Sequence, residues 1–220
     1  MLAPDPDKAR FNMVEQQIRP CEIIDERVLA AFKAIPREHF VDESQRPLAF
    51  ADTQLPLPNG DVMMKPLQEG FMLQALEVKP GERVLEVGTG SGFVTACLAH
   101  LGGRVTSYEI DPEQSARAAE RLQALGIDAE LVVGDIFEAD LPEGSFDVIA
   151  VTGSLPCPSE KLERLLAPGG RMFLVKGEPP VMCATLVTRA EEGDALLRKG
   201  LCETLLPPLK NAPQPDHFQF

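Results

Sequence analysis

The feature that most constrains the fold of this chain is the stretch 88–92, which reads G-T-G-S-G and places a glycine at every second position. An apolar-rich segment, residues 83–87, precedes it, and a helical pattern follows over residues 93–100. A strand that enters a helix through a glycine turn forms the first half of a βαβ unit. Ligands of open α/β sheets bind at such turns, at the carboxyl ends of the strands. The stretch therefore predicts a ligand site.

Three classes of ligand use a turn of this kind. A loop for nucleoside triphosphates needs Lys and then Ser or Thr after the last glycine, whereas Phe93 and Val94 follow here. A dinucleotide loop has the spacing G-x-G-x-x-G, and this chain is one residue short of it. Glu86, two residues before the first glycine, would repel a pyrophosphate but suits a cation. S-adenosylmethionine (SAM) is such a cation, and its one carboxylate suits the N–H groups at a helix start.

The next two predicted strands end in residues that fit the rest of this ligand. Glu109 ends the strand 105–110, 21 residues after the first glycine, where an acidic side chain can accept hydrogen bonds from ribose hydroxyls. Asp135 follows the strand 130–133 and is placed to accept from the adenine amino group, although a plain turn residue is an equal alternative for it alone. Ile110 and Ile136 would sandwich the ring. The order of these features predicts a SAM-binding domain whose cofactor residues are Glu86, Gly88, Thr89, Gly90, Ser91, Gly92, Glu109, Ile110, Asp135, Ile136 and Thr152.

Composition limits the possible partners and the compartment. A net charge of −13 and a pI near 4.7 disfavour nucleic acid, because phosphate contacts need a basic surface. No apolar run approaches the ~20 residues that span a bilayer, so we expect no membrane partner. The N-terminus lacks the pattern of a secretory signal. The five cysteines and three histidines are dispersed, which predicts reduced thiols, no metal site and a cytoplasmic location.

The remaining pattern predicts an α/β fold with a doubly wound, mostly parallel Rossmann-like sheet and helices on both faces. We expect residues 1–66 to form an N-terminal helical cap and substrate-side segment, and residues 67–220 to form the SAM-binding core of one compact domain. The first two helices should cover the nucleotide-binding half as a lid. The expected helices are 8–18, the one after Asp25, 68–76, 93–100, 112–125 and 159–166. The expected later strands are 146–151 and 171–175, followed by an antiparallel edge hairpin of 184–190 and 201–209.

Four smaller expectations concern single positions. Asp25 and Asp111 are predicted helix N-caps, and Gln114 should complete a capping-box-like arrangement with Asp111. Arg37 is a candidate anion ligand, but a structural salt bridge with a nearby carboxylate is the preferred interpretation. The aromatic residues of the stretch 217–220 should pack onto the sheet.

Several stretches resemble the protein-L-isoaspartate O-methyltransferase family. We expect this chain to be a divergent member of that family. The resemblance covers residues 10–176 and rests on F-N-M-V-E-Q-Q-I at 11–18, I-P-R-E-H-F-V at 35–41, A-F-A-D at 49–52, the glycine loop and V-T-G-S-L-P at 151–156. It implies a SAM-dependent O-methyltransferase of protein repair. Such an enzyme methylates the side-chain carboxylate of isomerised aspartyl residues in a protein or peptide.

Two departures from that family concern the methyl acceptor. Met64 stands where the family has the serine of a T-I-S-Q-P-like segment, and the family's V-T-A-A-A-P has become V-T-G-S-L-P. The predicted acceptor-pocket residues are Met64, Lys65, Thr152 and Ser154. No catalytic acid or base is predicted, because a carboxylate acceptor arrives as an anion and needs only alignment. The alternatives are a methyltransferase of a small molecule, such as a small carboxylate, and a SAM-binding module without turnover.

Overall fold

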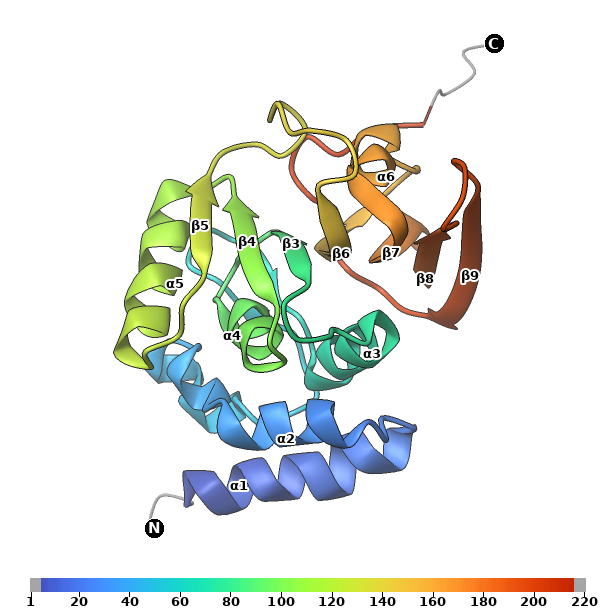
Figure 1. Ribbon diagram of the computed structural model, residues 1–220. Coiled ribbons are helices and arrows are strands. Elements are labelled where there is room, and N and C mark those ends of the chain that lie inside the picture. The colour runs from blue at the N-terminus through green and yellow to red at the C-terminus, as the bar shows by residue number, and fades with distance from the viewer. Residues whose placement is uncertain (1–4, 216–220) are drawn as a thin grey trace.

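The computed structural model describes residues 5–215 and has one large mixed sheet with helices on both faces (Figure 1). Its seven strands lie in the order β5-β4-β3-β6-β7-β8-β9. The first five of that order are parallel, and β8 and β9 continue the sheet antiparallel to β7 and to each other. The strands are β3 (Arg83–Val87), β4 (Arg104–Glu109), β5 (Glu130–Val133), β6 (Phe146–Leu155), β7 (Leu166–Glu178), β8 (Val181–Arg189) and β9 (Leu196–Glu203). The doubly wound α/β prediction is confirmed.

The strand order reverses between β3 and β6, and this reversal positions the site. From β3 the chain winds outward to β4 and β5, then returns to the other side of β3 with β6 and continues to β7. The crossover segments leave a crevice above the carboxyl ends of β3 and β6, where open α/β sheets bind ligands. The glycine loop lies at the end of β3, as predicted.

Alternating side chains of the central strands supply two hydrophobic layers. Val84 and Val148 belong to the cluster that includes the helical cap, α3 and α4, whereas Leu85 and Ile149 belong to the cluster that includes α6. The core helices are α3 (Pro66–Leu76), α4 (Phe93–His100), α5 (Pro112–Ala124) and α6 (Glu160–Leu165). Both faces of the parallel sheet are therefore covered.

The N-terminal helical cap consists of α1 (Pro6–Met13), a π-helical turn Val14–Ile18, a 3-10 turn Arg19–Cys21 and α2 (Glu26–Ala34). The Asp25 side chain accepts from Arg27 N at 2.8 Å and caps α2. Val28, Phe32 and Ile35 are buried. The cap packs on α3 and α4 at one end of the molecule (Figure 1) and contributes no described residue to the cleft discussed below, so it does not act as the expected lid. One core cluster contains side chains from both sides of residue 66. The division of the chain at residue 66 into a cap and a SAM-binding core stays a prediction.

Two further 3-10 turns, Arg37–His39 and Glu43–Leu48, connect the cap to a small antiparallel pair, β1 (Leu55–Pro56) and β2 (Val62–Met63). The loop between β1 and β2 reaches the carboxyl ends of the large sheet, where its residues line the cleft.

The structure corrects two further sequence-based expectations and extends another. The hairpin's second strand is Leu196–Glu203, so the prediction of 201–209 is wrong beyond Glu203, where Pro207 and Pro208 lack the N–H groups of a ladder strand. The Gln114 side chain does not complete a capping box: its Nε2 donates to Gly90 O at 2.6 Å. Strand β6 runs four residues beyond the expected end, to Leu155. The prediction for residues 217–220 lies outside the described part of the chain.

Candidate active site

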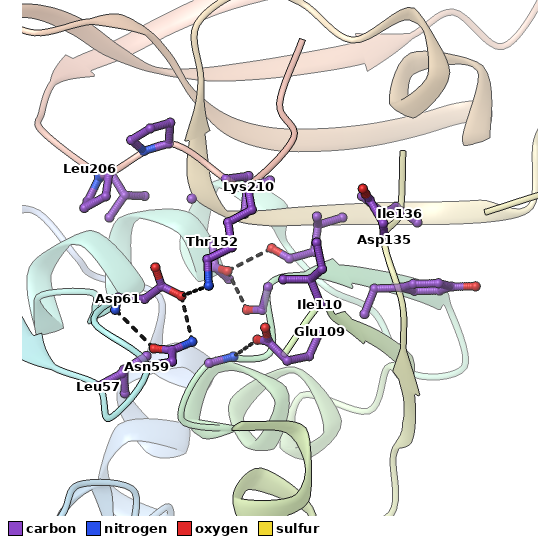
Figure 2. A pocket seen from close by; sticks show the side chains of 18 of the residues that line it. Leu57, Asn59, Asp61, Glu109, Ile110, Asp135, Ile136, Thr152, Leu206 and Lys210 are labelled. Atoms are coloured by element: carbon purple, nitrogen blue, oxygen red, sulfur yellow. Dashed lines mark hydrogen bonds and ion pairs between the residues drawn. The ribbon is translucent and has the colours of Figure 1, made fainter. Parts of the chain in front are cut away.

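A cleft opens at the carboxyl ends of β3, β4, β5 and β6 (Figure 2). Its floor is made by the glycine loop and Thr152, and its outer wall by two segments, 57–62 and 206–210, that come from distant parts of the chain. Apolar side chains supply much of the lining. Acidic groups, Asp61, Glu109 and Asp135, face it as well.

The glycine loop has a backbone that side chains would not tolerate. Gly88 and Gly90 adopt φ angles of +92° and +51°. A Cβ atom on Gly88 would lie 2.5 Å from Thr152 Oγ1. That hydroxyl donates to Val87 O at 2.8 Å and approaches Gly88 O at 2.5 Å, which ties the end of β6 to the loop. The glycines therefore allow the backbone itself to form the floor of the cleft.

Glu109 lies at the end of β4 with its carboxylate held against this loop. Its Oε2 accepts from Gly90 N at 2.9 Å and its Oε1 accepts from Asp111 N at 3.1 Å. The side chain is 6% exposed and lines the cleft. Because two backbone donors fix the carboxylate, it presents its remaining lone pairs in one orientation.

At the end of β5, Asp135 and Ile136 line the cleft opposite Ile110, which follows β4 (Figure 2). Asp135 Oδ1 accepts from Phe137 N at 2.8 Å, and Oδ2 accepts from Asn211 Nδ2 at 2.7 Å. The two isoleucines and the carboxylate are thus brought together as the sequence predicted. This end of the cleft can hold a flat apolar ring with a hydrogen-bond donor on its edge.

Four of the predicted cofactor residues, Glu86, Thr89, Ser91 and Gly92, are not among the lining residues. Glu86 is fully buried beneath the loop, where Oε2 accepts from the hydroxyls of Thr95 and Ser107. Burial raises the pKa of Glu86 to about 8, although those two hydroxyls lower it. The chain of hydrogen bonds continues from Ser107 to Thr89 at 2.6 Å. In this geometry Glu86 supports the loop from below, and direct contact with a cofactor stays a prediction.

The predicted acceptor residues are not gathered in one place. Thr152 lines the cleft, but Met64 and Lys65 line a second cavity between the start of α3 and strands β7–β9. Ser154 is 1% exposed, and its backbone pairs with Pro207 O at 2.8 Å and Leu209 N at 3.0 Å. Their roles toward an acceptor stay predictions.

The sequence analysis missed both outer-wall segments. Asp61, from the β1–β2 loop, and Lys210, after the last strand, meet with a 3.3 Å separation between Oδ2 and Nζ. Leu209 packs against the glycine loop, 3.4 Å from the position of a Cβ atom on Gly88. The one local signal was the Pro-Pro pair at 207–208, which excludes a ladder strand but does not say where the chain goes.

The chemistry of the lining fits SAM better than a phosphorylated ligand. Among the described residues that line the cleft, three are acidic and one, Lys210, is basic. A pyrophosphate needs several positively charged groups around it, whereas carboxylates stabilise a sulfonium and an ammonium group. Ile110, Ile136 and Asp135 suit adenine, and Glu109 suits ribose hydroxyls.

Within residues 5–215 no helix is both long enough and apolar enough to cross a membrane. In the same part of the chain no group of three or more His, Cys, Asp or Glu side chains could hold a metal ion.

Comparison with known proteins gives a consistent result. A family profile, protein-L-isoaspartate(D-aspartate) O-methyltransferase (PCMT), matches residues 8–201. Protein-L-isoaspartate O-methyltransferase 2 of Anaeromyxobacter sp. is 40% identical over 190 residues, 86% of this chain and 78% of that protein. The Aeropyrum pernix protein-L-isoaspartate O-methyltransferase is 38% identical over 207 residues, 92% of this chain and 79% of that protein.

A solved structure shows the same fold. A putative protein-L-isoaspartate O-methyltransferase from Plasmodium falciparum, in complex with S-adenosyl-L-homocysteine, superposes with a TM-score of 0.80 at 22% identity, covering 94% of this chain and 99% of that one. Sequence matches over most of the chain and the shared fold agree with the resemblance seen in the sequence. This chain belongs to the protein-L-isoaspartate(D-aspartate) O-methyltransferase family, and it is a SAM-dependent O-methyltransferase.

Proposed function

We propose that this protein transfers a methyl group from SAM to the side-chain carboxylate of isoaspartyl residues in proteins and peptides. The observation that carries the proposal is the family match over residues 8–201, which includes both the glycine loop and the P-R-E-H-F-V segment at 36–41. The acidic cleft at the switch point supports it, because this cleft suits the cationic methyl donor.

Within the cleft we assign the cofactor residues by their chemistry. Glu109 would accept from the ribose hydroxyls, and Asp135 from the adenine amino group between Ile110 and Ile136. The floor at Gly88 and Gly90 would hold the methionyl part, because these glycines let the backbone at the end of β3 line the cleft. Glu86, buried below, would keep the loop in place.

The proposed reaction needs no general acid or base from the protein. When bound, SAM supplies a methyl group on a sulfonium, which a carboxylate oxygen can take up without a general base. The chain's own residues have to bind the acceptor, align it and keep water out. Among residues 5–215, neither His39 nor His100 lines the cleft.

The location is also a proposal. All five cysteines, Cys21, Cys97, Cys157, Cys183 and Cys202, are free thiols. Free thiols are typical of a reducing compartment, which supports action in the cytoplasm on proteins damaged there.

The direct test uses SAM with a labelled methyl group and two peptides that differ only in an isoaspartyl or an aspartyl linkage. We expect label in the isoaspartyl peptide alone, released as methanol by base because the product is an ester. Calorimetry with S-adenosylhomocysteine gives the independent measure of cofactor binding. Cofactor binding without transfer to the isoaspartyl peptide would contradict the proposed acceptor and favour a small-molecule acceptor or a module without turnover.

A further inference from the structure

The entrance of the cleft lies between two segments that reach it from opposite sides. The loop between β1 and β2 supplies Asn59 and Asp61, and the segment after β9 supplies Leu206 and Lys210 (Figure 2). Lys210 and Asp61 span this entrance with their ion pair. The other walls are the strand ends and the glycine loop.

An anionic acceptor meets an unfavourable lining here. Asp61, Glu109 and Asp135 all face the cleft, and Lys210 is the one basic side chain among its described lining residues. Lys65, the basic residue among the predicted acceptor-pocket residues, lines the second cavity instead. Among the described side chains that line the cleft, Lys210 alone can therefore offset the negative charge that an acceptor carboxylate adds beside the cationic cofactor.

The ion pair is built so that Lys210 can change partners. Its two side chains are 47% and 46% exposed, and such exposed pairs contribute little stability. Asp61 does not depend on the lysine, because Asn59 Nδ2 donates to its Oδ2 at 2.7 Å. Asp61 N also donates to Asn59 Oδ1 at 3.1 Å, which fixes the turn. Releasing Lys210 thus leaves no carboxylate without a donor.

The backbone that carries Lys210 is anchored beside the site. Leu209 N donates to Ser154 O at 3.0 Å, and Ser154 N donates to Pro207 O at 2.8 Å. These bonds join the segment to the end of β6, two residues from Thr152. The lysine backbone is held in place while its side chain stays half exposed.

We propose that Lys210 binds the carboxylate of the methyl acceptor, and that Asp61 occupies the lysine until the acceptor replaces it. The inference rests on the proposed function, because it requires a carboxylate acceptor. It assigns opposite effects to the two partners of one ion pair: Lys210 attracts the acceptor, and Asp61 competes with it.

The test measures kcat and KM for the isoaspartyl peptide with the full chain and three variants. Lys210→Met should raise KM for the peptide by about fivefold or more, as for one lost charged contact, whereas Lys210→Arg should stay within about twofold. Asp61→Asn should lower KM by about twofold, because it removes the competing charge. Lys199→Met, an exposed lysine on β9, is the control and should leave KM unchanged.

Binding of S-adenosylhomocysteine by calorimetry separates the possible roles of the lysine. We expect its affinity to stay within about twofold in all variants, and melting temperatures to show that each one folds. A rise in KM with both Lys210→Met and Asp61→Asn would mean a structural ion pair and would overturn the inference. Weaker cofactor binding in Lys210→Met would overturn it too, by assigning the lysine to the cofactor's carboxylate. Absence of any transfer to the peptide by the unaltered chain would instead overturn the proposed function and the inference together.

Discussion

Arg37 and Glu69 form an ion pair inside the core, with side chains 0% and 1% exposed. The guanidinium also donates to Ala49 O at 2.9 Å and Met64 O at 2.8 Å, and it lies 4.8 Å from the ring centre of Phe93. This arginine therefore joins the turn after α2 to α3, α4 and the segment that carries Met64. The salt-bridge interpretation of Arg37 is confirmed. Arg37 is not among the described residues that line the cleft.

Removal of this arginine should be costly. Arg37→Met leaves the Glu69 carboxylate buried without its partner, and we expect a loss of about 3–5 kcal/mol in the free energy of unfolding. Urea unfolding measures it. Arg83→Met is the matched control, because the Arg83–Asp147 pair is 48% and 31% exposed and should contribute less than about 1 kcal/mol. Similar losses in both variants would contradict the prediction.

The buried carboxyl of Glu86 should make stability depend on pH. Burial raises its pKa from the ordinary 4.5 to about 8 in the folded chain. The folded state therefore binds the extra proton between these values, and its stability falls as the pH rises from about 4.5 through 8. Glu86→Gln removes this titration, so its melting temperature relative to the parent should increase between pH 5 and pH 8.5. Glu113→Gln, an exposed change on α5, serves as the control, and parallel pH profiles for all three proteins would disprove the assignment.

Cofactor affinity should depend on the charge of Glu109. A hydrogen bond from a ribose hydroxyl to a carboxylate contributes about 1.5–3 kcal/mol. Glu109→Gln should thus weaken binding of S-adenosylhomocysteine roughly tenfold, measured by calorimetry. Gln keeps one oxygen for Gly90 N but loses the acceptor of Asp111 N, so the melting temperature should fall modestly as well. An affinity equal to that of the parent would remove Glu109 from the cofactor site.

The glycine loop offers a test with a built-in comparison. Gly88 and Gly126 both have positive φ angles, +92° and +65°. A Cβ atom on Gly88 would lie 2.5 Å from Thr152 Oγ1, whereas nothing lies within 4 Å of one on Gly126. Gly126→Ala should cost only the backbone strain, about 1–2 kcal/mol. Gly88→Ala should lower the free energy of unfolding by more than that and should also weaken cofactor binding. If the two variants have equal effects on the free energy of unfolding and on cofactor affinity, the close approach of Thr152 to Gly88 is unimportant.

Met64 allows the acceptor to be tested from the protein side. Its side chain is 3% exposed and offers no strong donor, where the family's serine would provide a hydroxyl. Met64 lines the second cavity, so a serine hydroxyl there meets the acceptor carboxylate only if the acceptor extends into that cavity. In that case Met64→Ser should raise kcat/KM for the isoaspartyl peptide about tenfold, as expected for one hydrogen bond to a charged group. The change should also lower stability by about 2 kcal/mol or more, because it empties part of a packed region. Increased turnover is the informative result; unchanged or lower turnover in a folded variant would show that the methionine does not limit this reaction.

Local patterns were enough to predict the parallel core and the floor of the cleft. The G-T-G-S-G turn, the strand ends at Glu109 and Asp135, and the N-caps at Asp25 and Asp111 depend on residues close together in the sequence. Parallel strands bring their carboxyl ends to one edge, so features at successive strand ends converge without knowledge of other contacts. The chain could be assigned to a SAM-binding fold on this basis.

The placement of Glu86 shows where local pattern and packing separate. Strand alternation puts Glu86 on the same side as Val84, which faces the cluster containing α4. Thr95 on α4 and Ser107 on β4 then supply its hydrogen bonds from below the loop. The alternation was present in the sequence, but the identity of the donors depended on how helix and strand pack.

By itself, then, the sequence determined the order of strands and turns and the acidic character of the strand ends, because these follow from short-range periodicity and turn chemistry. Only the tertiary structure decided which distant segments close the cleft. Lys210 meets Asp61 across 149 positions of sequence, and Met64 turns toward a second cavity rather than the first. Such contacts depend on the packing of whole elements against one another, which no local pattern of residues encodes.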